Sequence, residues 1–176
     1  MSKSSGKLKY QVVLEEFLKA REWEDELSID DENKKVALVT GVTMGEHSGK
    51  LIIEASDETD LVGVYFYLGF ECKKSKRTEM CILLNDFNAR GGVGGYGCFQ
   101  LLDADDDRIR WVHRVDFEGS SPTGNSVERI VGPGWERVSA FIEIICAVAL
   151  TKQSAAEAIE EFDSSSSGNS EESSES

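Results

Sequence analysis

The sequence has few basic residues and no long hydrophobic run. It carries 19 Lys and Arg residues against 33 Asp and Glu residues, a formal net charge of -14. Nucleic-acid binding depends on basic residues that displace counterions, so nucleic acid is not an expected partner. No apolar stretch follows residues 1–9 as a signal peptide requires, and the most apolar window, Val138 to Leu150, is shorter than the ~20 residues of a membrane span. We therefore expect a cytoplasmic protein without a membrane partner.

Histidine and paired cysteine are also scarce. There are two histidines, His47 and His113, and neither has a recognisable nucleophile motif beside it. None of the 4 cysteines forms a C-x-x-C pair, which favours reduced, buried thiols over a zinc site or a disulfide. We therefore expect no catalytic residue, no cofactor and no enzyme activity; an enzyme with an unrecognised site has the least support.

The length of 176 residues, with 40% hydrophobic residues, fits one globular domain. We expect a flexible N-terminus at residues 1–9 and a single domain at residues 10–162. Residues 163–176 are serine and acid with one glycine and one asparagine and no apolar side chain, which predicts a disordered tail. Such a tail can act as a solubiliser or as a phosphorylation target.

Hydrophobic periodicity predicts the order of the elements. Apolar residues have helical spacing at 10–18 and 78–89. Strand patterns are found at 36–42, 51–55, 61–70, 96–102 and 109–117. Pro133, between two glycines, predicts a helix break before a long helix that begins at Trp135. The resulting order, α-βββ-α-ββ-α, predicts an α+β fold with one antiparallel sheet and helices packed on it.

The strand at 61–70 is apolar on both faces, a pattern typical of a central strand covered on both sides. One of these faces carries Tyr65 and Tyr67. The strand at 109–117 alternates instead, with Arg110 and Arg114 on the face opposite Trp111. Two strands therefore offer aromatic and arginine side chains.

Two glycine-rich segments resemble nucleotide-binding loops but lack their context. Residues 92–97 fit G-x-G-x-x-G, yet they leave a helix and enter a strand, whereas the dinucleotide motif does the reverse. Residues 45–51 have one residue too few for a phosphate loop, and Leu51 replaces the Ser or Thr that binds magnesium. A helix stop with a mobile loop and a hairpin tip explain them better.

An acidic turn offers weak metal candidates. Asp103, Asp105 and Asp107 occupy the first, third and fifth positions of a calcium loop. Arg108 stands at the glycine position, and Arg114 stands where the bidentate Glu is needed. We expect an acidic β-turn and no metal, although weak Ca²⁺ binding stays open.

A family resemblance rests on two segments and the order around them. Leu83-Leu84-Asn85-Asp86-Phe87-Asn88 ends a predicted helix, and Asp116-Phe117-Glu118-Gly119 closes the second strand after the aspartate-rich turn. Over about Tyr10 to Ala158 this arrangement resembles the YbjN family, grouped as candidate bacterial sensory-transduction regulators with a fold similar to that of type III secretion chaperones. The sequence departs from the family in the missing glycine after the aspartates, the elaborate loop at 91–97 and the acidic serine tail.

The resemblance implies a non-enzymatic protein-binding module: a regulator, an adaptor or a chaperone-like homodimer. Asn85 and Asn88, one helical turn apart, form a motif that we interpret as structural, with Asn88 capping carbonyls and Asn85 holding the following loop. The alternative function is a small-ligand or Ca²⁺-binding domain that uses the acidic turn 103–107 and the loop 91–97 as a lid.

We predict that the partner, another protein or a second copy, binds the face that carries Tyr65 and Tyr67, near Arg110 and Arg114. Aromatic residues and arginine are enriched at binding hot spots. The alternative for this face is that a helix covers both tyrosines.

Overall fold

The computed structural model describes residues 6–90, 97–103 and 106–168. Its elements in chain order are α1 (Lys9–Arg21), β1 (Leu27–Asp30), β2 (Lys35–Met44), β3 (His47–Ser56), β4 (Leu61–Glu71), the 3-10 turn η1 (Lys74–Lys76), α2 (Arg77–Ala89), β5 (Cys98–Leu101), β6 (Arg108–Asp116), α3 (Gly124–Leu150) and α4 (Ala155–Gly168). The predicted α+β class and the broad order of elements are confirmed, with strand β1 and helix α4 in addition.

The strands form one open antiparallel sheet in the order β1-β2-β3-β4-β6-β5. The predicted hairpin is formed by β2 and β3, which meet at the Met44 and His47 pair. Gly45 has a φ of 61°, in the left-handed region that glycine adopts without a steric penalty. Because β3, β4 and β6 are neighbours, side chains far apart in sequence share one face of the sheet.

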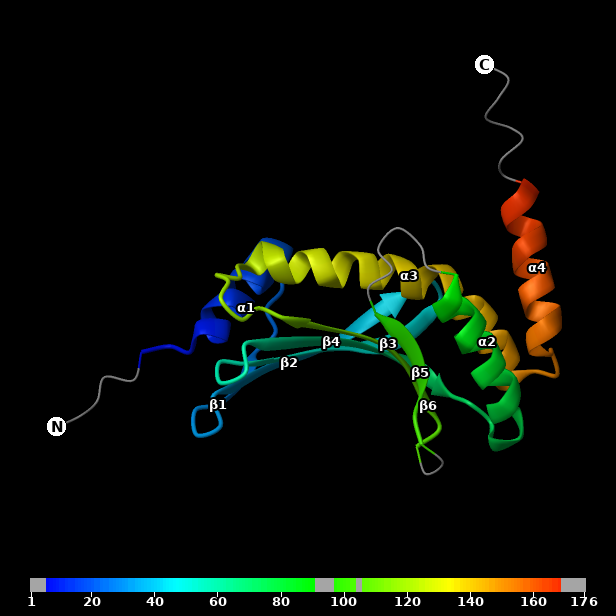
Figure 1. Cartoon of the computed structure of the whole chain (residues 1–176), viewed down its shortest axis with the longest axis horizontal. Coiled ribbons are helices and arrows are strands. Elements are labelled where there is room, and N and C mark those ends of the chain that lie inside the picture. Colours follow the sequence, from blue (N-terminus) through cyan, green and yellow to red (C-terminus); the bar gives the residue numbers. More distant parts are fainter. Residues whose placement is uncertain (1–5, 91–96, 104–105, 169–176) are drawn as a thin grey trace, which may run out of the picture.

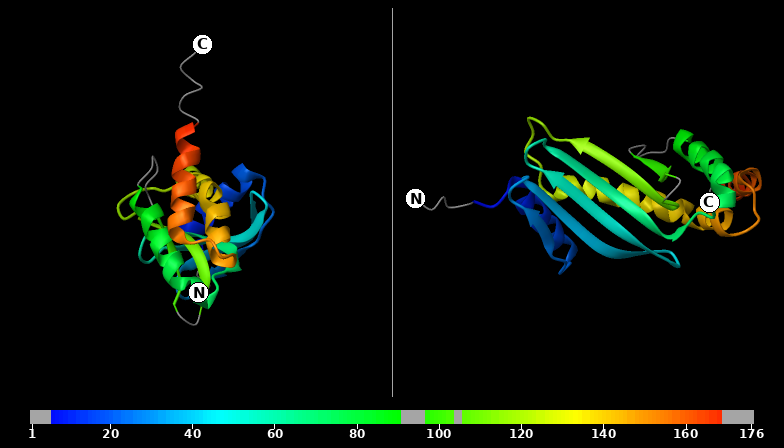
Figure 2. Two further views of the ribbon diagram at one scale, coloured as in Figure 1. Left: turned by 90° about the vertical axis from the view of Figure 1, so that its right-hand side faces the viewer. Right: turned by 90° about the horizontal axis from the view of Figure 1, so that it is seen from below.

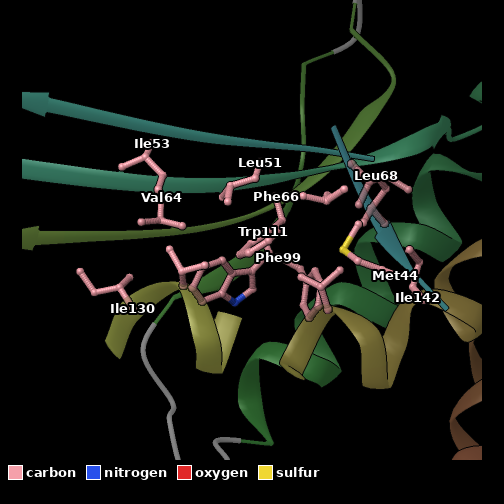
Figure 3. Close-up of a cluster of buried hydrophobic side chains, with 14 of the residues drawn as sticks. Met44, Leu51, Ile53, Val64, Phe66, Leu68, Phe99, Trp111, Ile130 and Ile142 are labelled. Atoms are coloured by element: carbon pink, nitrogen blue, oxygen red, sulfur yellow. The ribbon is translucent and has the colours of Figure 1, made fainter. Parts of the chain in front are cut away.

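The core lies between the sheet and the helices. Alternate strand residues point towards α3 and are buried, among them Leu51, Ile53, Val64, Phe66 and Trp111 (Figure 3). Helices α1 and α3 lie on this inner face, and α2 and α4 lie at one end of the molecule (Figure 1). Seen from the opposite side, the strands lie in front of α3, and no helix of the described chain covers them (Figure 2). We call this the outer face.

The expectation that the strand at 61–70 is covered on both sides is therefore wrong. Helices cover β4 on its inner face only. Its outer apolar residue, Tyr65, is nevertheless 6% exposed, because side chains of the sheet itself shield it. The alternative in which a helix covers both tyrosines is wrong for the same reason.

The predicted helix break at Pro133 is also wrong, since α3 runs without interruption from Gly124 to Leu150 with Pro133 inside it. An internal proline removes one hydrogen bond and costs about 3 kcal/mol. Ile130 and Val138, on either side of the proline, are both buried in the core. Packing of this amphipathic helix against the sheet outweighs the local cost, as tertiary contacts often do.

Helix α4 folds back beside α2 after a break at residues 151–154. The Phe162 ring lies 5.1 Å from the Phe141 ring of α3 and 5.9 Å from the Phe87 ring of α2, measured between centroids. Arg90 is ion-paired with both Asp86 and Asp163. The helix continues to Gly168, so the prediction of a disordered tail from residue 163 is wrong for residues 163–168, and residues 169–176 lie outside the described chain.

Candidate functional site

The strand register brings the four predicted partner-binding residues together on the outer face. Tyr65 pairs with Val112, and Tyr67 pairs with Arg110. Arg114 pairs with Gly63, one position along the same face. Two residues from β4 and two from β6 thus form a contiguous group, which we call the Tyr–Arg cluster: Tyr65, Tyr67, Arg110 and Arg114.

Tyr65 lies flat against the sheet because its neighbour along the strand face has no side chain. A Cβ atom at Gly63 would come within 2.7 Å of the Tyr65 hydroxyl and 2.9 Å of its ring. The Nε of Arg114 donates a hydrogen bond of 3.1 Å to that hydroxyl. Guanidinium groups over a tyrosine face are attracted by its π electrons, and those of Arg110 and Arg114 lie 5.2 Å and 5.6 Å from the Tyr65 ring centroid. Glycine, tyrosine and arginine thus form one packed layer.

Arg110 is held by two hydrogen bonds. Its Nε donates a 3.0 Å hydrogen bond to the Oε1 of Gln100 on β5, and its Nη1 donates a 2.9 Å bond to the Tyr67 hydroxyl. The Arg108 guanidinium lies 5.2 Å from the Tyr67 ring centroid. The polar ends of both tyrosines and of Arg110 are therefore fixed before any partner binds.

The cluster is embedded in two rows of side chains that cross the sheet. The first row is apolar and contains Val39, Ile52, Tyr65, Val112 and Cys98. Val39 is 55% exposed. The second row is polar and contains Gly41, Lys50, Tyr67, Arg110 and Gln100. A partner on this face would meet an apolar stripe beside a basic one.

The outer face also has two shallow hollows beside the cluster. One, of about 360 Å³, lies over β3 and β4 and is lined in part by Val39, Lys50 and Tyr67. The other, of about 590 Å³, lies over β5 and β6 and is lined in part by Arg110 and Arg114. Both have room for side chains of a bound partner.

The two cluster arginines lack the carboxylate partners that several other arginines of the described chain have. Arg21 is paired with Glu128, Arg77 with Asp107 and Arg108 with Asp106. Within the described ranges, no carboxylate lies within ion-pair distance of Arg110 or Arg114, whose hydrogen bonds go to neutral groups. The cluster therefore holds two guanidinium groups without an ion-pair partner in the described chain.

The acidic turn is only partly described. Asp105 lies outside the described chain, as do residues 91–96 of the glycine-rich loop. Asp107 accepts a 2.6 Å hydrogen bond from Arg77, and hydrogen bonds from Arg108 lower the pKa of Asp106 to about 2. No group of three or more His, Cys, Asp or Glu residues that could hold a metal ion occurs in the part of the chain that the structure describes. The carboxylates of Asp106 and Asp107 thus form ion pairs with arginines.

The two asparagines lie in different environments. Asn88 accepts a 2.7 Å hydrogen bond from the Phe99 amide and donates a 2.9 Å bond to the Phe99 carbonyl. It thus joins the end of α2 to strand β5, where we had predicted a cap on helix carbonyls. Asn85 is exposed.

The histidines and cysteines have structural contacts. His47 lies 3.0 Å from Glu143, measured from Nε2 to Oε2, and His113 stacks on Trp111 with ring centroids 6.0 Å apart. Burial lowers the pKa of His113 and raises the pKa of the Cys72 and Cys146 thiols. These shifts favour a neutral imidazole and protonated thiols, which are the unreactive forms of both cysteines.

Sequence reasoning missed Gly63, Gln100 and Lys50 as part of the site. Each reaches the cluster through cross-strand pairing, with Gly63 opposite Arg114, Gln100 opposite Arg110 and Lys50 opposite Tyr67. The alternation in the strands gives the face of each residue but not its register. The glycine between Val62 and Val64 was a signal, since glycine in a strand often marks a close approach by another group.

Fold and site together define an α+β protein with an open sheet, helices on one face only and an aromatic and basic outer face. Residues 11–147 match the family model of YbjN, described as "Putative bacterial sensory transduction regulator". This match covers most of the chain, so the chain belongs to the YbjN family. A regulatory or adaptor role fits that description, and YbjN is not a known enzyme family. None of the curated proteins compared with the chain matches it.

Two further results concern membrane contact and the end of the chain. No helix in the described ranges is long and apolar enough to cross a membrane. Helix α4 lies beyond the segment that matches the family. Its packing against α2 and α3 is thus a feature of this chain outside the family match.

Proposed function

We propose that this chain is a cytoplasmic, non-enzymatic regulator or adaptor that binds another protein, or a second copy of itself, through the Tyr–Arg cluster. The observation that carries the proposal is the absence of any described helix over a sheet face where aromatic and arginine side chains gather. Tyrosine and arginine dominate binding hot spots because they bury large areas and form directed hydrogen bonds.

Pre-organisation of the cluster supports the proposal further. Association costs entropy when side chains must be immobilised. Here Tyr65 is already packed on Gly63, and Arg110 already bridges Gln100 and Tyr67. Binding of a partner to these ordered groups would therefore cost less entropy than binding to mobile side chains.

The experiment that tests the proposal compares Tyr67→Glu with Ile82→Glu. Ile82 is on α2, away from the outer face, and is 52% exposed, so this control adds the same charge at an exposed position. Tyr67→Glu should abolish capture of a recurrent, stoichiometric partner by the tagged chain, or convert a dimer into a monomer in sedimentation, while circular dichroism stays unchanged. Ile82→Glu should behave like wild type. A folded Tyr67→Glu variant that keeps the wild-type partner and mass would refute the face assignment.

The resemblance to type III secretion chaperones adds a finer hypothesis, in which the partner segment is bound in extended form and the chain is a homodimer. The antiparallel sheet with one uncovered face offers a surface of suitable length for an extended segment. Sedimentation of the wild-type chain over a range of concentrations tests the dimer directly.

The second candidate is a small-ligand or Ca²⁺ site at the acidic turn 103–107 and the loop 91–97. A cation there would have to compete with Arg77 for Asp107 and with Arg108 for Asp106. Isothermal titration with Ca²⁺ and with nucleotides would decide between the two. Heat of binding that Asp103→Asn weakens would favour this candidate over protein binding.

A further inference from the structure

The hydrogen bonds of the Tyr–Arg cluster leave one end of each arginine available. A guanidinium has five N–H donors. Arg114 donates from Nε to Tyr65, and its two Nη atoms have no hydrogen bond within the described chain. Arg110 donates from Nε and Nη1, and its Nη2 atom is likewise without a partner in the described ranges. The Nε ends are anchored to the sheet, which orients the guanidinium planes and leaves both Nη atoms of Arg114 and the Nη2 atom of Arg110 for a ligand.

The two guanidinium groups without an ion-pair partner favour an anion between them. Two carboxylates of the same face lie on the Arg114 side of this space and not within it, since Glu54 is opposite Gly63, in the row of Arg114, and Asp116 is two residues beyond Arg114. The chain carries 33 acidic residues, yet Arg110 and Arg114 are paired with none of those that the structure describes. The exposed Lys50 lies in the same row as Arg110 and adds a third positive charge. Arginine binds carboxylates through two parallel hydrogen bonds, and such charge-assisted bonds are about twice as strong as neutral ones.

The spacing of the two arginines selects the shape of the ligand. They are four residues apart on one face of β6, which places their Cα atoms about 13 Å apart in a strand. Both guanidinium groups lean towards the Tyr65 ring, 5.2 Å and 5.6 Å from its centroid, so the charged groups are closer together than the Cα atoms. An extended segment with acidic residues at positions i and i+4 has the same spacing and presents both on one side. Val112 lies midway between the arginines and, like Tyr65 beside it, is buried. The residue at i+2 would lie over these two side chains, of which 7% and 6% is exposed.

We propose that the partner segment is an extended acidic peptide with carboxylates four residues apart, bound by Arg110 and Arg114, and with an apolar residue between them over Val112 and Tyr65. This proposal deepens the proposed function and rests on it. The net charge of -14 does not prevent such binding, because charges more than about 10 Å apart are largely screened at 0.1 M salt, whereas contact pairs are not.

Defined peptides test the proposal by fluorescence anisotropy at 0.1 M salt. The probe is a labelled peptide of Ser and Thr with Glu at positions 4 and 8 and Val at position 6. One control peptide has Gln in place of both Glu residues, and another carries the two Glu residues side by side. Wild-type chain should bind the probe about tenfold or more tightly than either control, since two charge-assisted contacts are gained.

Protein variants complete the test. Arg110→Gln with Arg114→Gln should weaken binding of the probe about tenfold or more and remove its preference over the Gln peptide. Lys19→Gln with Lys152→Gln removes the same charge from exposed positions on other parts of the molecule and should leave binding unchanged. A probe that binds wild type no better than the Gln peptide, or equally well to both double variants, overturns the proposal.

The outcomes separate this proposal from the proposed function. If no peptide preference is found but Tyr67→Glu still releases a partner, the ligand class is wrong and the binding face stands. If the cluster substitutions instead dissociate a homodimer and the probe does not bind, the occupant is a second copy and the acidic-segment proposal is refuted. If neither peptide nor partner responds to the cluster, both proposals fall.

Discussion

Gly134 determines how closely helix α3 approaches the sheet. A Cβ atom at this position would lie 2.6 Å from the Trp111 ring and 3.0 Å from the Phe66 ring. Both rings are fully packed in the core, so neither has space to move away. The large aromatic residues of β4 and β6 therefore require a residue without a side chain at this turn of the helix.

A pair of substitutions in one helix tests this contact. Gly134→Ala should lower the free energy of unfolding by about 1–3 kcal/mol, because the methyl group overpacks the core. Gly132→Ala meets only the flexible end of Glu128, at 3.4 Å. Its gain in helix propensity is offset by the contact between the new Cβ atom and the ring of Pro133 that follows, so stability should change by less than about 1 kcal/mol. Urea denaturation measures both. Equal effects of the two substitutions would contradict the proposed packing.

For individual residues, sequence patterns often predicted on which face of the sheet a side chain lies. The alternation in β6 correctly set Ile109 and Trp111 in the core and Arg110 on the opposite side. The same pattern could not reveal that Gly63 lies beside Arg114, because pairing depends on the register between strands 51 positions apart in the sequence. Local periodicity carries no such long-range information.

At the scale of elements, Asn88 links α2 to the edge strand β5. Its side-chain amide bonds both the N–H and the C=O of Phe99, as a neighbouring strand would. Strand β5 has only four residues, Cys98–Leu101, and pairs with β6 on its other side. The amide of Asn88 therefore secures a short strand that also supplies Gln100 to the Tyr–Arg cluster.

Asn88→Ala should lower the free energy of unfolding by about 1–3 kcal/mol, because it leaves two half-buried backbone groups without their partner. The matched control is Asn85→Ala, one turn earlier and exposed, which should change stability by less than about 0.5 kcal/mol. Urea denaturation gives both values, and hydrogen exchange should be faster at the Phe99 amide in Asn88→Ala alone. An Asn88→Ala variant as stable as the control would argue against the link.

Two of the wrong predictions about helices and strands have the same cause. Pro133 and its glycines predicted a break, and the apolar strand at 61–70 predicted a double cover. Both expectations used local sequence alone. The first was overridden by packing of Ile130 and Val138 in the core, and the second by arginines from β6 that shield Tyr65. Contacts between distant segments decided each case.

At the scale of the whole molecule, helix α4 closes one end of the core. Ala155 and Ala158 are each 1% exposed, and the Ala155 amide donates a 2.7 Å hydrogen bond to Glu79 of α2. A hydrogen bond from Arg90 lowers the pKa of Asp163 in the same helix. The tail was expected to be disordered from this aspartate because serine and acid follow it; the ion pair with Arg90 was not visible in the sequence.

Removal of α4 should destabilise the chain without affecting the outer face. A chain that ends at Leu150 should lose about 1–3 kcal/mol of unfolding free energy, since Phe87 and Phe141 lose the cover of Phe162. A chain that ends at Gly168 keeps the helix and should match the full chain within about 0.5 kcal/mol. Thermal and urea unfolding measure the difference. A shortened chain of unchanged stability would mean that α4 does not pack on the core.

Helix α1 and helix α3 are joined by the ion pair of Arg21 and Glu128, 107 residues apart, and by the hydrogen bond from the Gly124 amide to Glu16. A ribosome adds about 5–20 residues per second, so α1 waits roughly 5–20 s for its partner helix to be made. Strands β1 to β4 pair with sequence neighbours and are complete long before then. Helix α1 is therefore synthesised well before the helix that packs beside it, and its apolar stripe of Val13, Leu14 and Phe17 stays without the cover of α3 until α3 has been made.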